Sequence, residues 1–117
     1  MAIAKTNENQ SAGGQKRATI MVQTDGAINV VQAAASIGTI LSAYQIPKSA
    51  FFRLRVLSSN KAETAVLVDV TGRAISDGAD PSTITIYLWC ADVAGITVPA
   101  NSYIMLEAEW NESVNSD

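Results

Sequence analysis

The chain has 117 residues, a formal net charge of −3, no histidine and a single cysteine. This length suits one domain with its own hydrophobic core. A lone cysteine excludes an intrachain disulfide and a thiolate-rich metal site, and the lack of histidine removes the usual base of a nucleophilic enzyme. The small net charge by itself implies neither a nucleic-acid nor a membrane partner.

The charges are distributed unevenly along the chain. Residues 1–58 carry six basic and two acidic side chains, whereas residues 59–117 carry two basic and nine acidic ones. Halves of opposite charge attract each other, either within one molecule or between neighbouring subunits of an assembly. Residues 26–47 match a membrane span in length, but polar residues interrupt them, and residues 1–14 contain no apolar run. We therefore expect neither a transmembrane segment nor a signal peptide.

The two ends of the chain are polar. Residues 1–16 are interpreted as an N-terminal arm that lies outside the fold and serves association, because such a sequence has no core of its own. The folded domain is expected to span residues 17–110, and residues 111–117 are expected to form a polar tail.

The domain reads as a succession of strands. Residues 30–45 are ambiguous, and we favour a short helical or irregular turn at 32–36 followed by a strand from about Gly38. Residues 72–82 and 92–95 carry turn residues and are predicted loops. Alternation of apolar and polar residues predicts further strands over 17–23, 27–31, 51–58, 64–71 and 102–110.

The strongest strand signal lies at residues 83–91, which alternate strictly with period two. One face carries Ile84, Ile86, Leu88 and Cys90, and the other carries Thr83, Thr85, Tyr87 and Trp89. Because both faces are bulky, we expect a central strand whose apolar face, with its thiol, lies in the core. The aromatic face is expected to lie under a loop or a neighbouring subunit, since so much aromatic area is rarely left in water.

Residues 46–56 and 98–108 share one pattern at an offset of 52 residues: a β-branched residue, a proline, a polar corner and an alternating strand. Pro47 and Pro99 are suited to corners because proline cannot donate to a sheet ladder. The chain is therefore predicted to be all-β. We expect an antiparallel sandwich of seven or eight strands with jelly-roll or Greek-key connections and an extended polar N-terminal arm.

Two sets of carboxylates were weighed as chemical sites. Asp77 and Asp80 offer oxygen ligands to Ca²⁺, but their spacing matches no complete calcium loop, and a solvated turn is the simpler interpretation. Glu107 and Glu109 share one strand face and resemble a glycosidase pair only through ordinary pleat geometry. No nucleotide loop, nucleophile elbow, zinc spacing or triad occurs in the sequence, so we expect no enzyme, cofactor or metal.

The side chains that face away from the core suggest interfaces instead. Arg53 and Arg55 give one echoed strand a basic outer face, and Glu107 and Glu109 give the other an acidic one. The 52-residue offset matches Arg55 with Glu107. These faces either pair side by side in one sandwich or meet between subunits. We add Tyr87 and Trp89 to the predicted interface.

The chain resembles the small virion proteins of bacteriophages in four features. It has no catalytic constellation, it has few charges, both of its ends are polar, and its two halves carry opposite charge. These virion proteins are capsid decoration and minor capsid proteins with a β-sandwich body and an extended N-terminal arm. The resemblance implies self-association, often into trimers or rings, contacts with other structural subunits, and location in the virion after synthesis in the host cytoplasm.

The expected function is thus that of a structural subunit, and two alternatives stay open. One is a carbohydrate-binding module that uses an aromatic platform drawn from Tyr87, Trp89, Tyr103 and Trp110, of which at most a part is coplanar because Tyr103 and Trp110 lie on opposite faces of their strand. The other is a single-stranded nucleic-acid binder that uses Arg53 and Arg55, although the acidic second half argues against it.

Overall fold

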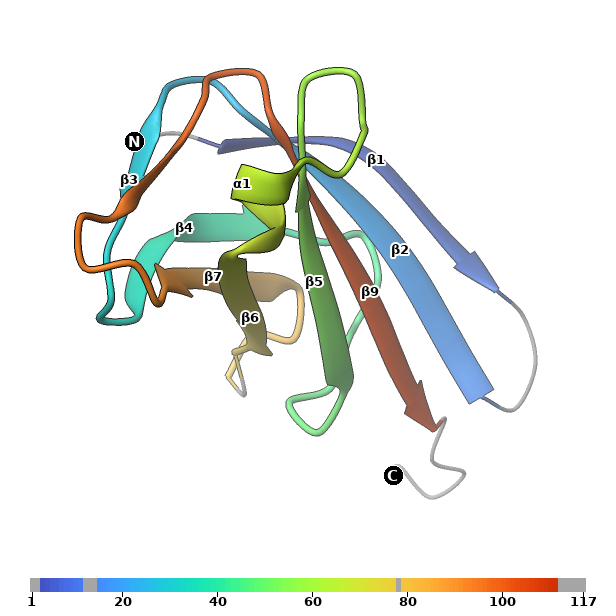
Figure 1. The fold of residues 1–117 in the computed structure, drawn as a ribbon. Coiled ribbons are helices and arrows are strands. Elements are labelled where there is room, and N and C mark those ends of the chain that lie inside the picture. Colours follow the sequence, from blue (N-terminus) through green and yellow to red (C-terminus); the bar gives the residue numbers. More distant parts are fainter. Residues whose placement is uncertain (1–2, 12–14, 78, 112–117) are drawn as a thin grey trace.

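The computed structural model describes residues 3–11, 15–77 and 79–111 and shows an antiparallel β-sandwich (Figure 1). The strands form a four-stranded sheet in the order β1-β2-β9-β5, a three-stranded sheet β4-β7-β6 and a small pair β3-β8. The described elements are β1 (Ile3–Ser11), β2 (Gln15–Thr24), β3 (Ile28–Val30), β4 (Ala35–Leu41), β5 (Phe51–Leu57), α1 (Ala65–Val68), β6 (Val70–Ser76), β7 (Thr83–Cys90), β8 (Ile96–Val98) and β9 (Tyr103–Asn111). The predicted all-β fold is confirmed.

The strand pairs follow a nested order, in which strands from the first half of the chain pair with strands from the second half in reverse sequence order. β2 pairs with β9, β3 with β8 and β4 with β7, all antiparallel, while β5 and β6 lie against each other where the chain turns back. This is the pattern of one long antiparallel ribbon wound on itself, as in a jelly roll. In Figure 1, β1, β2, β9 and β5 run side by side as a broad twisted sheet, and β4 and β7 run across its inner side.

The core lies between the inner faces of the two larger sheets. Period two sends alternate residues inward, and these are apolar on every central strand. Their burial removes each side chain from water, which stabilises the fold by about 1.5–3 kcal/mol per large residue. Among the most deeply buried are Ile20 and Val22 of β2, Ile84, Ile86, Leu88 and Cys90 of β7, and Ile104 and Leu106 of β9.

The strands at 51–58, 83–91 and 102–110 are confirmed as β5, β7 and β9, each within one or two residues. β7 is the central strand of its sheet, as predicted. The echoed segments 46–56 and 98–108 contain the corners that precede β5 and β9, which are neighbours in one sheet. Near the second corner, the buried Thr24 hydroxyl accepts from the Ser102 N–H at 3.0 Å and donates to the Pro99 carbonyl.

The N-terminal residues differ from the interpretation of 1–16 as an arm outside the fold. Residues 3–11 form β1, which pairs with β2 along its length and forms an edge of the four-stranded sheet. A sheet ladder needs only backbone N–H and C=O groups, so a polar sequence can occupy an edge where both side-chain faces reach water. Residues 1–2 and 12–14 of the predicted arm, and 112–117 of the predicted tail, lie outside the described residues.

Glu8 connects β1 to the segment that follows β4 through hydrogen bonds. Its carboxylate accepts hydrogen bonds from the Ser42 hydroxyl and, at 3.0 Å, from the Ala43 N–H, and it pairs with Lys5 at 2.7 Å. Burial alone raises the pKa of Glu8, but the hydrogen bonds from Lys5, Ser42 and Ala43 outweigh it and lower the pKa. The folded chain therefore favours the charged carboxylate.

Glu8→Gln is expected to lower the free energy of unfolding near neutral pH by about 1–2 kcal/mol, because the donors lose a charged acceptor. A lowered pKa means that this contribution is present above the pKa of the unfolded glutamate and fades as pH falls through the folded value. Urea unfolding of both proteins between pH 7 and pH 3 tests this, with the exposed Glu63→Gln as control. A difference that persists at pH 3 would contradict the assigned role of the charge.

Two further predictions were wrong. Residues 64–71 were predicted to be a strand, but 65–68 form the short helix α1, capped by the Thr64 hydroxyl, which accepts from the Leu67 N–H at 3.3 Å. The strand β6 begins at Val70 and extends into the predicted loop 72–82. Alternating valines favour a strand, yet in α1 only Leu67 is buried, while Val66 and Val68 stay exposed.

The ambiguous segment contains no helix in the structure. Residues 31–34 form a loop, and β4 begins at Ala35, slightly before the expected Gly38. A register shift lies between Ser36 and Gly38, and Gly38 has a φ of 145°, which glycine adopts readily. The small strand β8, which pairs with β3, was not predicted. Within the described residues, no helix has the length and apolar character needed to cross a membrane.

Candidate functional site

The outer face of the four-stranded sheet gathers polar side chains from all its strands. On β2 and β9 the even-numbered residues Ala18, Ile20, Leu106 and Ala108 are buried, so their odd-numbered neighbours point outward. The register places them in rows across the sheet. We call this surface the arginine face, and it consists of Asn9, Arg17, Thr19, Met21, Phe51, Arg53, Arg55, Tyr103, Met105, Glu107 and Glu109.

One row of the arginine face contains an internal ion pair. Arg17 and Glu109 lie opposite each other on β2 and β9, and their side chains meet at 2.9 Å. Both are well exposed, with 64% and 40% of each side chain accessible, so water and salt screen the pair. The pair orients Glu109 and adds at most about 1 kcal/mol to stability.

The next rows leave charges without ionic partners. Arg53 of β5 lies directly opposite Glu107 of β9, yet among the described residues neither forms an ion pair. Arg55 lies opposite Met105 and approaches its sulfur at 4.0 Å. These guanidinium and carboxylate groups retain their capacity to bind something outside the chain.

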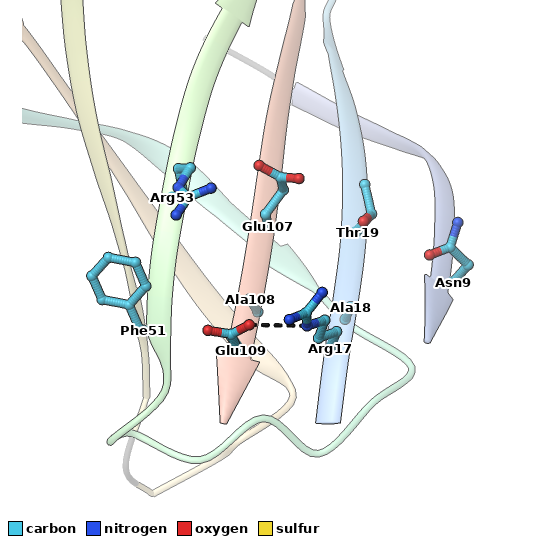
Figure 2. Close-up of a pocket in the computed structure, with 9 residues that line it drawn as sticks. All are labelled: Asn9, Arg17, Ala18, Thr19, Phe51, Arg53, Glu107, Ala108 and Glu109. Carbon is cyan, nitrogen blue, oxygen red and sulfur yellow. Dashed lines mark ion pairs between the residues drawn. The ribbon is translucent and has the colours of Figure 1, made fainter. Parts of the chain in front are cut away.

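The lower half of the arginine face is hollowed (Figure 2). The hollow has a volume of about 360 Å³, and side chains of all four strands line it. Figure 2 shows Asn9, Thr19, Glu107 and Arg53 in one row across the strands, with the ring of Phe51 near Arg53 at one end of the row. This arrangement offers an amide, a hydroxyl, a carboxylate and a guanidinium in one row, with an aromatic ring at one end, a set that binds polar partners without covalent chemistry.

The structure brings together four of the six predicted interface residues. Arg53, Arg55, Glu107 and Glu109 all lie on the arginine face, and the basic and acidic strands are neighbours within the chain. Within the chain, the antiparallel register sets Arg53, and not the Arg55 that the 52-residue offset matches, opposite Glu107. An offset compares strands in the same direction, whereas neighbouring antiparallel strands run in opposite directions. A contact between Arg55 and Glu107 of different subunits stays a prediction.

Tyr87 and Trp89 lie elsewhere, on the outer face of the three-stranded sheet. Both are partly buried, and the Arg73 guanidinium lies 5.0 Å from the centre of the Tyr87 ring. Trp89 lies opposite Thr71 of β6. Whether a further subunit covers this pair stays a prediction.

The sequence reasoning missed the contribution of β1 and β2 to the site. Arg17 and Thr19 alternate with the buried Ala18 and Ile20, so period two was the available signal for their outward direction. Phe51, which is 62% exposed, shares the outer side of its strand with Arg53 and Arg55, so the same period of two was the available signal for its direction. No pattern in the sequence shows that Asn9 joins them, because this depends on the pairing of β1 with β2.

Asp77 and Asp80 serve the hydrogen bonding of their own loop. Asp80 accepts from the Ser82 hydroxyl at 2.6 Å, from the Ser82 N–H at 3.1 Å and from the Thr83 hydroxyl at 3.1 Å. These bonds, led by that from the Ser82 hydroxyl, lower the pKa of Asp80. Asp77 accepts from the Ala79 N–H at 2.8 Å. In the part of the chain that the structure describes, no cluster of three or more acidic, cysteine or histidine side chains is placed to hold a metal.

The sequence matches no protein-family model and no curated protein. Two solved structures are distantly similar. The family 3a carbohydrate binding module from the cipA scaffolding of Clostridium thermocellum is 10% identical, with 95% of this chain and 73% of that chain covered and a TM-score of 0.38. The CBM3a-L domain with flanking linkers from the same scaffoldin is 11% identical, with 95% and 65% covered and a TM-score of 0.38. We draw no functional conclusion from likeness at this level.

Proposed function

We propose that the chain is a non-catalytic structural subunit that assembles with copies of itself, of the kind found in virions, through the arginine face. The observation that supports this is the composition of the face. It carries Arg17, Arg53 and Arg55, together with two methionines, a phenylalanine and a tyrosine. Arginine, methionine and aromatic residues are enriched in protein interfaces, whereas lysine is depleted there.

The geometry of the face suits a large partner. A sheet holds its residues at fixed spacings before a partner binds, so association has to order only the side chains and not the backbone. Phe51 offers apolar area beside Arg53 and Glu109, and Arg53 and Glu107 have no ionic partner among the described residues. Association would supply both an apolar contact and partners for these charges.

Arg53→Glu is expected to weaken self-association while the fold is retained, because it reverses the charge of an exposed side chain of the arginine face. Sedimentation velocity across a concentration series at low salt measures the effect, and thermal unfolding checks the fold. Lys48→Glu is the matched control, since it makes the same charge change at an exposed residue outside the face. Association of Arg53→Glu that equals that of the wild type and of the control would contradict the proposal.

A second candidate function is carbohydrate binding, which the hollow favours. Sugars can donate and accept hydrogen bonds with planar polar side chains while they pack on an aromatic ring, and the hollow presents Arg53 and Glu107 near Phe51, with Asn9 at its far side. Glycan-array binding by the wild type that is lost in Phe51→Ala, together with a monomeric wild-type protein, would support this function over assembly.

A further inference from the structure

We propose that the free edge of β5 takes up an additional strand from a partner polypeptide, and that this strand alternates acidic and apolar residues. Such a partner is additional to the second copy of the chain in the proposed function, and it binds an edge of the sheet rather than the arginine face. The hydrogen bonding of β5, the burial of its side chains and its charges lead to this partner.

The backbone of β5 is paired on one side. β5 lies at the end of the four-stranded sheet, and β9 is its hydrogen-bonded neighbour (Figure 1). Among the described residues, no hydrogen bond joins the backbone of Phe51–Leu57 to an element other than β9. Alternate residues of an antiparallel strand point their N–H and C=O groups away from the paired neighbour. These groups of β5 can therefore pair with a further strand.

The burial of β5 shows which part of this edge is open. Val56 and Leu57, at the end of the strand, are buried, and α1 packs against β5. In residues 51–55, by contrast, the inward side chains Phe52 and Leu54 are only partly buried, whereas inward residues of β2 and β9 are almost fully buried. A strand beside residues 51–55 would cover apolar area that the chain itself leaves partly in water.

The other edge of the same sheet, β1, is protected against such pairing. Its inward positions include Lys5 and Glu8, which lie opposite the buried Val22 and Ile20. A register shift follows Lys5, and Glu8 is bonded to the segment after β4. Inward charges and bulges are means by which proteins keep sheet edges from pairing. β5 has apolar inward residues in their place, so the two edges differ in kind.

The charges of β5 specify the chemistry of the partner. Arg53 and Arg55 are exposed on the outer face, and neither forms an ion pair among the described residues. A strand that fits beside them has carboxylates at alternate positions on this face, because opposite charges across two strands attract each other. Its intervening residues lie opposite Phe52 and Leu54 and are therefore apolar.

A second copy of β5 does not fit this edge. Antiparallel pairing centred on Arg53, the register that covers residues 51–55, sets Arg53 opposite Arg53 of the partner subunit. A shift by two residues toward the end of the strand sets Arg53 opposite Arg55 of the partner subunit. Like charges directly opposite each other are destabilising. An acidic strand avoids this repulsion and gives both arginines a partner.

The probe is a synthetic peptide with the sequence of residues 102–111, which has the required alternation: Ser-Tyr-Ile-Met-Leu-Glu-Ala-Glu-Trp-Asn. Antiparallel to β5, it can set its two glutamates opposite Arg55 and Arg53 and its alanine opposite Leu54. Titration into isotope-labelled protein at low salt should give saturable changes in the amide NMR signals of β5. A peptide with both glutamates replaced by lysine should bind at least about tenfold more weakly, because two attractive contacts become repulsive.

Two N-methylated peptides test whether the backbone makes the contact. One carries the methyl group on the nitrogen of its second glutamate, and the other carries it on the preceding alanine. Adjacent residues of a strand point their N–H groups to opposite sides, so one methyl group faces β5 and the other faces away. We therefore expect one of these peptides to bind like the unmodified peptide and the other to lose binding.

Arg55→Glu tests the contribution of charge from the side of the protein. It should weaken binding of the glutamate peptide by at least about threefold and strengthen binding of the lysine peptide. Lys48→Glu makes a matched charge change at an exposed residue outside β5, and it should bind both peptides like the wild type. Thermal unfolding of each variant confirms that it is folded, and the modified peptides test the wild type independently of both variants.

Several results would overturn the proposed strand addition. They are equal binding of the glutamate and lysine peptides, no saturable change up to about 1 mM peptide, and amide changes centred on β1. Binding of both N-methylated peptides, or of neither, would also overturn it, because an added strand tolerates a methyl group on one side only. Self-association of the wild type and of Arg53→Glu is measured without peptide, so the proposed function and the strand addition can fail separately.

Discussion

Ile86→Ala is expected to lower the free energy of unfolding by about 2–5 kcal/mol, the usual range for truncation of a large aliphatic side chain in a core. Ile86 is fully buried at the middle of β7. Its cross-strand neighbours are Gly38 on β4 and Ala74 on β6, which are both small. Neighbours of this size cannot extend into the vacated space, so the cavity should persist and the cost should lie in the upper part of the range.

Thr85→Ala provides the matched control on the same strand. Thr85 points to the outer face and is only partly buried, so its truncation should cost less than about 1 kcal/mol. Urea unfolding of both variants, followed by circular dichroism, gives the two free energies. If the two truncations cost the same, the alternation along β7 does not separate a core face from an outer face.

Gly72→Ala is expected to destabilise the protein by about 1–3 kcal/mol, because the core has no room for a methyl group at this position. A Cβ atom at residue 72 would overlap a methyl carbon of Leu54 and would lie 2.7 Å from one of Leu88. Leu88 is almost fully buried and cannot swing into solvent. Leu88 lies opposite residue 72 in the same sheet and would have to adopt a strained rotamer, while the contact with Leu54 would require that side chain or the facing sheet to move away.

Truncation of Leu54, the nearest neighbour of a Cβ atom at residue 72, should relieve part of the clash. Adding Leu54→Ala to Gly72→Ala should cost less than the sum of the two single changes, since the nearer methyl group is then removed. Gly26→Ala is the control, because a Cβ atom there would have no neighbour within 4 Å. Thermal and urea unfolding of the four variants gives their free energies of unfolding. Equal stability of Gly72→Ala and Gly26→Ala would contradict the close packing around residue 72.

The sequence by itself determined the fold class and the faces of the central strands. In β7 the alternation of side chains is uninterrupted, and in β5 and β9 it fails only at the ends of the strands, so a residue's direction follows from its own position in the strand. The core position of Ile86 and Cys90 and the outward direction of Arg53 and Glu107 were predictable for this reason. Local patterns are sufficient for such properties because the pleat is a local geometry.

The tertiary structure decided which strands are neighbours and in what register. The polar residues 3–11 become β1 because the edge of β2 offers unpaired backbone groups and Glu8 finds donors after β4. Likewise, Val66 and Val68 belong to a helix rather than to a strand. No local pattern contains these facts, because they depend on hydrogen bonds between residues far apart in the chain.

For the candidate site, too, the sequence and the tertiary structure determine different properties. The outward direction of its charged residues could be predicted from the sequence, but which of them lie together could not. Arg53 lies opposite Glu107 because β5 and β9 run antiparallel in one sheet, and Trp89 is separated from both because β7 belongs to the other sheet. Partner and direction of a strand are set by the packing of the whole chain, so only the folded structure could assemble the arginine face and leave the aromatic pair outside it.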